Sequence, residues 1–169
     1  MSIFFGATIS CRRTVALDAF DQAHRQACWY ALLRKMTGRA ASHLQEYTLQ
    51  PTNSQPERRF LGLQDISVEK ITGSLNRAAD FDEAFRPLKG HLRSRWADIY
   101  LQLREDRWPP VIVYKVGGQY FVEDGHHRVS VARSVGMAFI QAEVYEIPLR
   151  RMPQAQPAAV GVLQPETCC

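Results

Sequence analysis

The sequence predicts an α/β protein, in which a small sheet with helices follows an N-terminal helix. Residues 111–116 are rich in β-branched side chains, Gly117-Gly118 suits a two-residue turn, and a strand-like run covers residues 119–124. Together these features indicate a β-hairpin. Residues 140–145 alternate apolar side chains with others, as expected of a closing strand. A helix-forming stretch lies between the hairpin and this strand and ends at Gly136.

The N-terminal helix is expected over residues 12–37 and to end at Gly38, a favoured residue just after a helix. Its core-facing side chains recur at helical spacing: Ala16, Phe20, Ala23, Ala27 and Tyr30. A second apolar group falls on a different face near the helix end: Trp29, Leu32, Leu33 and Met36. We therefore expect the helix to contact two surfaces, and a homo-oligomer through this helix is one prediction.

Residues 40–58 are polar, contain Pro51 and Pro56, and are expected to be a linker. An apolar block begins at Phe60. Within it, apolar and polar side chains alternate over residues 66–68, which predicts a short strand. Thr72-Gly73-Ser74 is expected to form a turn that ends this block.

Residues 77–85 have short helical or looped character. A second amphipathic helix is expected between Leu92 and Leu103, because apolar residues repeat there at i, i+4, i+7 and i+11. Pro109-Pro110 cannot continue it. The expected organisation is a helix over 1–39, a linker over 40–58, a domain over 59–149 and a disordered tail over 150–169.

Composition narrows the class of protein. The chain has 169 residues, a net charge of +4, 46% hydrophobic and 22% charged residues, which is ordinary for a globular protein. The four cysteines lack the paired spacing of a zinc site or a disulfide framework: Cys11, Cys28, Cys168 and Cys169. No signal peptide or membrane-spanning run is visible in the sequence. A cytoplasmic protein without membrane contact is expected.

The junction between the hairpin and the next helix is the most informative segment. The strand stops at Asp124-Gly125, and the helix-forming stretch opens with two histidines and an arginine. Amide groups at a helix start, together with a nearby arginine, form an anion site suited to phosphate. The predicted phosphate-binding residues are Asp124, Gly125, His126, His127 and Arg128.

The order of elements and this turn resemble the ParB/sulfiredoxin superfamily, from about Phe60 to Ile147. The corresponding turn is Gly-Glu-Arg-Arg in partition proteins, Gly-Cys-His-Arg in sulfiredoxins and Asp-Gly-His-His-Arg in the free-serine kinases of this superfamily. Residues 71–74 (Ile-Thr-Gly-Ser) and 80–85 (Asp-Phe-Asp-Glu-Ala-Phe) are similar to motifs of an uncharacterised bacterial ParB-like group. The resemblance implies a small mixed sheet with helices.

The resemblance also implies that the turn holds nucleotide phosphates. Arg128 would grip a phosphate, Gly125 would let the backbone approach it, and His126 and His127 would add donors. Asp124 would cap the helix or bridge a metal and the phosphate. CTP, ATP or ADP with Mg²⁺ is the expected ligand, the Mg²⁺ being held mainly by the phosphates. A second wall of the site is predicted from Gly73, Ser74 and Arg77.

Departures from the family bear on the activity. Sulfiredoxins need a cysteine where this chain has His126, so repair of sulfinic acids is not expected. The serine kinases carry a glutamate where Ser74 aligns, and a serine hydroxyl is no base near neutral pH. Phosphotransferase or nucleotide hydrolase activity would need a substitute base, such as Glu69, Asp80 or Asp82. With Ser74 itself, these are the four candidate catalytic residues.

Three functions remain open. A regulatory nucleotide-binding module, whose bound state alters self-association or partner binding, is the main hypothesis; the serine-kinase-like phosphotransferase or nucleotide hydrolase is the second. The third is a DNA-associated protein that binds through a basic middle region, although no helix-turn-helix follows the domain. That region is better explained as a solvated helix face: Arg86, Lys89, Arg93, Arg95, Arg104 and Arg107. Zinc is not expected, because adjacent His126 and His127 point in different directions and His91 is distant in sequence.

Overall fold

The computed structural model describes residues 3–39, 43–47, 58–103 and 108–148. Six strands form one mixed sheet in the order β1-β3-β5-β4-β6-β2. This confirms the predicted fold class. The strands are β1 (Gln45–Glu46), β2 (Arg59–Ser67), β3 (Ile71–Ser74), β4 (Val111–Val116), β5 (Gln119–Asp124) and β6 (Phe139–Glu146). The helices are α1 (Ile3–Met36), α2 (Arg93–Leu103) and α3 (His126–Ser134), with short 3₁₀ turns η1 (Val68–Lys70) and η2 (Gly90–Leu92).

The predicted hairpin and closing strand are confirmed. β4 and β5 are antiparallel, and Gly117 and Gly118 between them have φ values of 57° and 89°, which favour glycine. β6 is parallel to β4 and antiparallel to β2. β3 joins the other side of β5 in parallel, and β1 joins β3.

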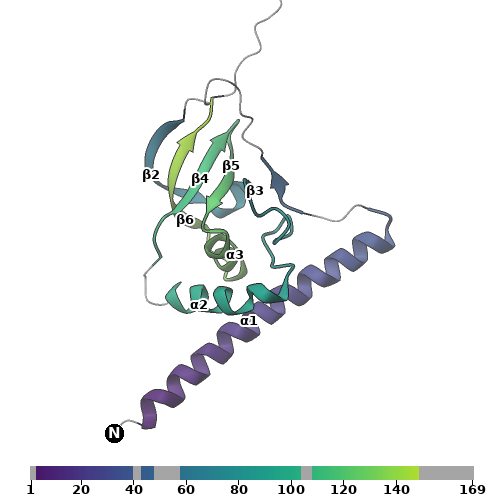
Figure 1. Ribbon diagram of the computed structural model, residues 1–169, viewed down its shortest axis with the longest axis vertical. Helices are drawn as coiled ribbons and strands as arrows, with labels where there is room; N and C mark the ends of the chain where they lie inside the picture. The colour runs from purple at the N-terminus through teal and green to yellow at the C-terminus, as the bar shows by residue number, and fades with distance from the viewer. Residues whose placement is uncertain (1–2, 40–42, 48–57, 104–107, 149–169) are drawn as a thin grey trace, which may run out of the picture.

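The helices form layers on one face of the sheet. Figure 1 shows α3 against the sheet, α2 beyond it and α1 crossing beneath α2. Trp96 of α2 is completely buried, and its indole nitrogen donates to the hydroxyl of Ser130 on α3 (2.9 Å). This bond joins the two helices inside the core.

Helix α1 is longer than predicted, because it begins at Ile3. It extends beyond the body of the protein at both ends (Figure 1). Its middle is docked through the predicted face, where Phe20 is buried edge-on to Trp96 with ring centres 5.8 Å apart. An ion pair between Asp21 and Arg93 (2.6 Å) flanks this contact. Tyr30 departs from the prediction: it is half exposed, and the guanidinium of Arg86 lies 4.0 Å from its ring centre.

Two sequence predictions about the middle of the chain are wrong. The expected linker contains strand β1, and the expected turn at residues 72–74 belongs to strand β3. A Cβ on Gly73 would collide with the carbonyl oxygen of Gln45 and, at 2.6 Å, with the ring of Phe121. The glycine therefore permits close strand packing rather than a turn. Residues 48–57, Arg104, Arg107 and the tail after residue 148 lie outside the described residues.

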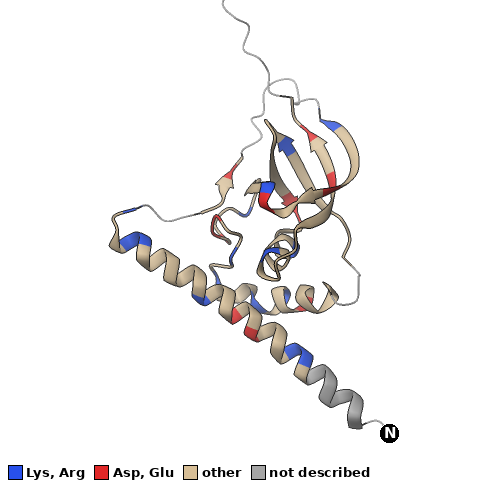
Figure 2. Cartoon of the chain, turned by 180° about the vertical axis from the view of Figure 1, so that it is seen from behind, with Lys and Arg blue, Asp and Glu red and all other residues tan. Residues whose placement is uncertain are grey.

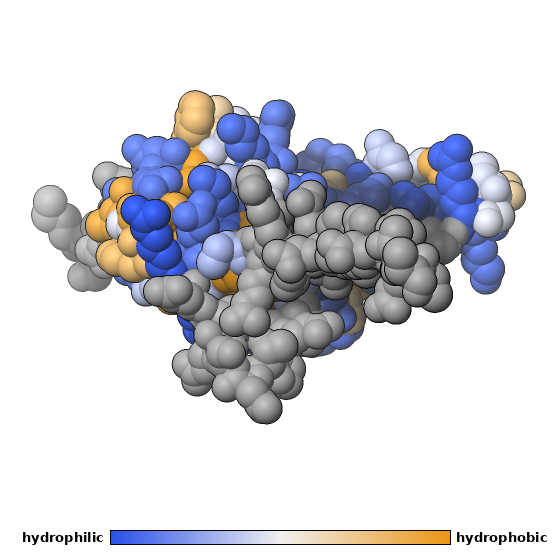
Figure 3. Space-filling view, turned by 90° about the horizontal axis from the view of Figure 1, so that it is seen from above, coloured by the Kyte–Doolittle hydropathy of each residue, from blue (hydrophilic) through white to orange (hydrophobic). Residues whose placement is uncertain are grey.

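The short strand expected at residues 66–68 is the end of a longer one. β2 pairs with β6 over most of its length, with one irregularity between Phe60 and Gly62. In the view from above, apolar side chains gather at the sheet end of the molecule, and mostly hydrophilic ones lie along α1 (Figure 3). Phe60 and Leu63 of β2 are among the exposed apolar side chains. Within the described ranges, none of the helices has the length and apolar character needed to cross a membrane.

Candidate anion-binding site at the start of helix α3

The turn between β5 and α3 requires glycine. Gly125 has a φ of 98°, and an added Cβ would lie 2.6 Å from Cγ1 of Val111. The first helical hydrogen bond of α3 runs from the amide of Val129 to the carbonyl of Gly125 (3.0 Å). The amides of residues 126–128 precede that bond, so they have no partner within the helix and suit an anion.

Arg128 is directed into the protein. Its guanidinium donates to the carbonyls of Pro109 (2.5 Å) and Pro110 (2.7 Å) and to the carboxylate of Asp124 (2.5 Å). Its side chain is only 9% exposed, whereas that of Asp124 is 67% exposed. Burial lowers the pKa of Arg128, and the charge of Asp124 offsets this in part. In this arrangement Arg128 fixes the turn to the segment that enters β4.

His126 is also directed inward. The hydroxyl of Ser74 accepts hydrogen bonds from the amides of Asn76 (3.2 Å) and Arg77 (2.9 Å). Its own proton is therefore available for Nε2 of His126, which lies 2.7 Å away. Burial, reinforced by the charge of Arg77, lowers the pKa of His126 to about 4, and its ring stacks on Phe81. His126 is thus neutral near pH 7 and belongs to the core.

His127 lies closer to the surface and in a positive environment. Burial and the charges of Arg77 and Arg95 lower its pKa to about 4. Its Nδ1 is buried and has no hydrogen-bond partner among the described residues. The two guanidinium groups therefore act on the same end of α3 that carries the unpaired amides.

Arg95 was not among the site residues predicted from the sequence. It was assigned to a solvated face of the helix, and it is exposed. Its neighbour Trp96 is bonded to α3, which brings the first turn of α2 near the start of α3. The sequence contained one indication of its position: Arg95 directly precedes Trp96, which lies on the apolar face of the predicted helix.

Arg77 is half exposed, and the carboxylate of Asp80 lies 3.9 Å away. Burial would raise the pKa of Asp80, but its bond to Lys89 (2.7 Å) and the positive charges of Lys89 and Arg77 together keep the pKa below its ordinary value. Asp80 is therefore held in its charged form by a cation.

The structure does not bring the four candidate catalytic residues together. Ser74 is completely buried, and Asp82 is 3% exposed and bonded to the side chain of Arg86 (2.7 Å). Glu69 lies at η1, beside the far end of α3. Ser74 and Asp80 are both near the turn: the hydroxyl of Ser74 contacts His126, and the charge of Asp80 acts on His126 and His127. Gly73, which was predicted to belong to a second wall of the site, is enclosed between neighbouring strands.

The turn has neither a grouped set of metal ligands nor the large cleft of the protein, as far as the described residues show. Within the described residues, no three His, Cys, Asp or Glu side chains are grouped as in a metal site. A cleft of about 1020 Å³ lies at the other end of α3, not at the turn.

The sequence matches no protein-family model and no curated protein. The structure is similar to that of sulfiredoxin from Arabidopsis thaliana, with a TM-score of 0.37 and 20% sequence identity. The similarity covers 48% of this chain and 82% of that one.

Proposed function

We propose that this protein binds a phosphate-bearing small molecule at the start of α3, as a regulatory module. The helix amides, Arg77 and Arg95 would contact the anion. The observation that carries the proposal is the start of α3, where the amides of residues 126–128 have no partner within the helix and Nδ1 of His127 is buried without a hydrogen-bond partner among the described residues. The charges of Arg77 and Arg95 act on His127 at the same place. A phosphate would accept hydrogen bonds from the amides and balance the two positive charges.

Arg128 has a supporting role in this proposal. Because its donors bind Pro109, Pro110 and Asp124, it holds the backbone of the turn in place before the amides that have no partner within α3. This differs from a direct grip on phosphate. Mg²⁺ accompanying CTP, ATP or ADP would be held chiefly by phosphate oxygens, and the exposed Asp124 would add one oxygen.

Binding is better supported than catalysis. A general base needs a pKa near the working pH and access to the substrate. Asp80 is the candidate near the turn that is not buried, and its bond to Lys89 lowers its pKa. The other candidates are buried or lie at η1. A phosphotransferase or hydrolase is therefore the second proposal, and it would depend on Asp80.

Regulation would act through the exposed end of α1. Trp29 is 60% and Met36 is 76% exposed, and Leu32 and Leu33 lie between them. Exposed aromatic and Met side chains are typical of protein–protein contacts. This face would carry self-association or partner binding in a manner that depends on the bound phosphate ligand.

DNA binding has less support. Three of the basic residues of the middle region are neutralised by acidic ones, since Arg86, Lys89 and Arg93 pair with Asp82, Asp80 and Asp21. Figure 2 shows basic and acidic residues interspersed on α1, α2 and the sheet. A DNA-binding surface usually concentrates unpaired positive charge.

Thermal unfolding of the full chain with inorganic phosphate, CTP, ATP, ADP and GTP, each with Mg²⁺, tests the proposal. We expect at least one ligand to raise the melting temperature, and this effect to be lost in Arg77→Gln and Arg95→Gln. Arg59→Gln is the matched control. Arg59 of β2 lies opposite Glu146 of β6 in the strand register, at the end of the sheet away from Asp124. The proposal fails if no ligand stabilises the protein, or if both site variants respond like the wild type. Salt-dependent binding of duplex DNA in the absence of any ligand response would favour the DNA hypothesis.

Assays of phosphate release and of transfer to free serine separate binding from catalysis. A regulatory module gives no product above a no-protein control. Product formation that is lost in Asp80→Asn would establish the second proposal instead.

A further inference from the structure

The cleft at the far end of α3 is bounded by elements that are distant in sequence. One wall is α1 from Ala19 to Gln26, and the other is the segment from Arg133 to Phe139, which ends α3 and leads into β6. Ser67–Glu69 and Arg86 contribute further lining. Small-molecule sites typically have volumes of about 300–1,000 Å³. At about 1020 Å³ the cleft is large enough to enclose much of a small ligand.

Arg133 lines this cleft and is half buried. Its guanidinium donates to the carbonyls of Val68 (3.1 Å), Ile71 (2.6 Å) and Glu83 (3.3 Å), all of them neutral acceptors. It also lies over the ring of Phe85, 5.0 Å from its centre. These contacts orient the guanidinium without balancing its charge.

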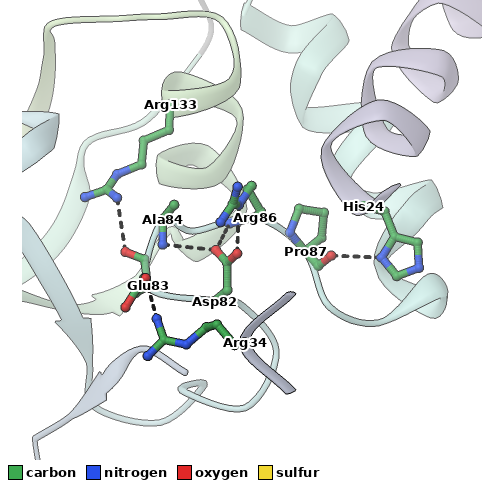
Figure 4. A network of polar contacts seen from close by, with 8 residues as sticks. All are labelled: His24, Arg34, Asp82, Glu83, Ala84, Arg86, Pro87 and Arg133. Carbon is green, nitrogen blue, oxygen red and sulfur yellow. Dashed lines mark hydrogen bonds and ion pairs between the residues drawn. The ribbon is translucent and has the colours of Figure 1, made fainter. Parts of the chain in front are cut away.

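The neighbouring acidic groups are used elsewhere. Asp82 binds the side chain of Arg86, and the side chain of Glu83 binds Arg34, as Figure 4 shows. Among the described residues, no carboxylate lies within ion-pair distance of Arg133. Burial lowers the pKa of Arg133, and Asp82 and Glu69 oppose this only through their charges. A half-buried cation without a paired anion is unfavourable unless an anion is supplied.

The surroundings favour an anion of single charge over a polyanion. Glu69 is exposed at one end of the cleft and would repel a polyanion. The carboxyl end of α3 also faces this region, and a helix carries partial negative charge at that end. These features contrast with the start of α3, where two arginines and free amides favour phosphate.

The remaining lining suits an apolar body. Phe139 is 60% and Val135 is 41% exposed, and Met137 is half buried between them in sequence. Gln22 and Gln26 of α1 supply amide groups on the opposite wall. We propose that this cleft binds a small organic monocarboxylate, whose carboxylate lies beside Arg133 and whose apolar part lies against Met137 and Phe139. Such a ligand would hold α1 to the body of the protein.

Isothermal titration of the full chain with benzoate tests this proposal, with benzamide as the neutral analogue. We expect saturable binding of benzoate at millimolar concentrations, and binding of benzamide weaker by tenfold or more. Inorganic phosphate in excess should not displace benzoate. No saturable benzoate binding, or equal binding of benzamide, overturns the proposal.

Two variants locate the binding without disturbing the core. Gln26→Trp fills the cleft from an exposed position and should abolish benzoate binding, whereas Lys35→Trp, on an exposed part of α1 outside the cleft, should leave it unchanged. Melting curves establish that both variants fold. Arg95→Gln, at the other end of α3, should also retain benzoate binding. Unchanged binding in Gln26→Trp, or loss of binding in Arg95→Gln, places the carboxylate elsewhere and refutes the cleft site.

Discussion

The hydroxyl of Ser74 lies 2.7 Å from Nε2 of His126, and this bond joins the end of β3 to the first residue of α3. Both side chains are buried, and the same hydroxyl accepts the amides of Asn76 and Arg77. One serine therefore organises both segments beside the candidate anion site. A base in a kinase would need to reach its substrate, and this serine does not.

Ser74→Ala should destabilise the protein by about 2–3 kcal/mol, because it leaves a buried imidazole nitrogen and two amides without their partner. Unfolding in urea, followed by circular dichroism, measures the change. Ser94→Ala, at an exposed position of α2, is the matched control and should have little effect. Equal stability of the two variants would contradict the role of this hydroxyl.

The stability of the protein should depend on pH through His126. Its pKa is about 4 in the folded protein and 6.5 in a free histidine, so below pH 6.5 the unfolded chain binds a proton that the folded chain does not. The free energy of unfolding therefore falls as the pH decreases from 6.5 to about 4, by up to about 1.4 kcal/mol per pH unit for this residue. Urea unfolding of the wild type and His126→Gln at several pH values measures the difference in slope.

In that experiment the His126→Gln profile should be flatter over this pH range. The exposed His91 provides a control, and His91→Gln should retain the wild-type slope. Parallel profiles for the wild type and His126→Gln would be incompatible with a buried neutral His126.

Gly73→Ala should destabilise the sheet strongly, because the new methyl group would overlap the carbonyl of Gln45 and the ring of Phe121. Overpacking of this kind costs about 1–3 kcal/mol or more. Thermal unfolding measures the change. Gly90→Ala is the control, since a Cβ added at Gly90 would meet no atom within 4 Å. A tolerated Gly73→Ala would mean that β1 is not packed against β3 in solution.

Phe20→Ala should weaken the docking of α1, because Phe20 is buried against Trp96. Removing a buried phenylalanine side chain typically costs about 3–5 kcal/mol. Trp29→Ala, on the exposed face of the same helix, should have little effect on the melting temperature. If both variants melt like the wild type, α1 is not packed on the domain through Phe20.

Arg128→Lys distinguishes a framework residue from a phosphate ligand. An ammonium group cannot reproduce the bonds to Pro109, Pro110 and Asp124, so a loss of stability of about 2–3 kcal/mol is expected. Phosphate affinity of the folded variant should decrease less than that of Arg95→Gln. A stable variant with abolished phosphate binding would instead support a direct grip by Arg128.

The elements that depend on local pattern were predictable. The hairpin, α2, α3 and β6 follow from turn residues and from periods of two or 3.6, which are properties of neighbouring residues. Strands β1 and β3 were missed because they are short. Gly73 also resembles a turn residue until the ring of Phe121 and the carbonyl of Gln45 are placed beside it.

The sequence by itself determined that a glycine turn would deliver a helix start with two histidines and an arginine, because Gly125 and its neighbours are adjacent in the chain. Only the tertiary structure decided which of these side chains face the core. His126 and Arg128 point inward because their partners, Ser74 and the carbonyls of Pro109 and Pro110, come from segments distant in the sequence. Packing of α2 on α3 likewise brought Arg95 close enough for its charge to act on His127. Contacts of this kind depend on how elements pack, and local spacing does not encode them.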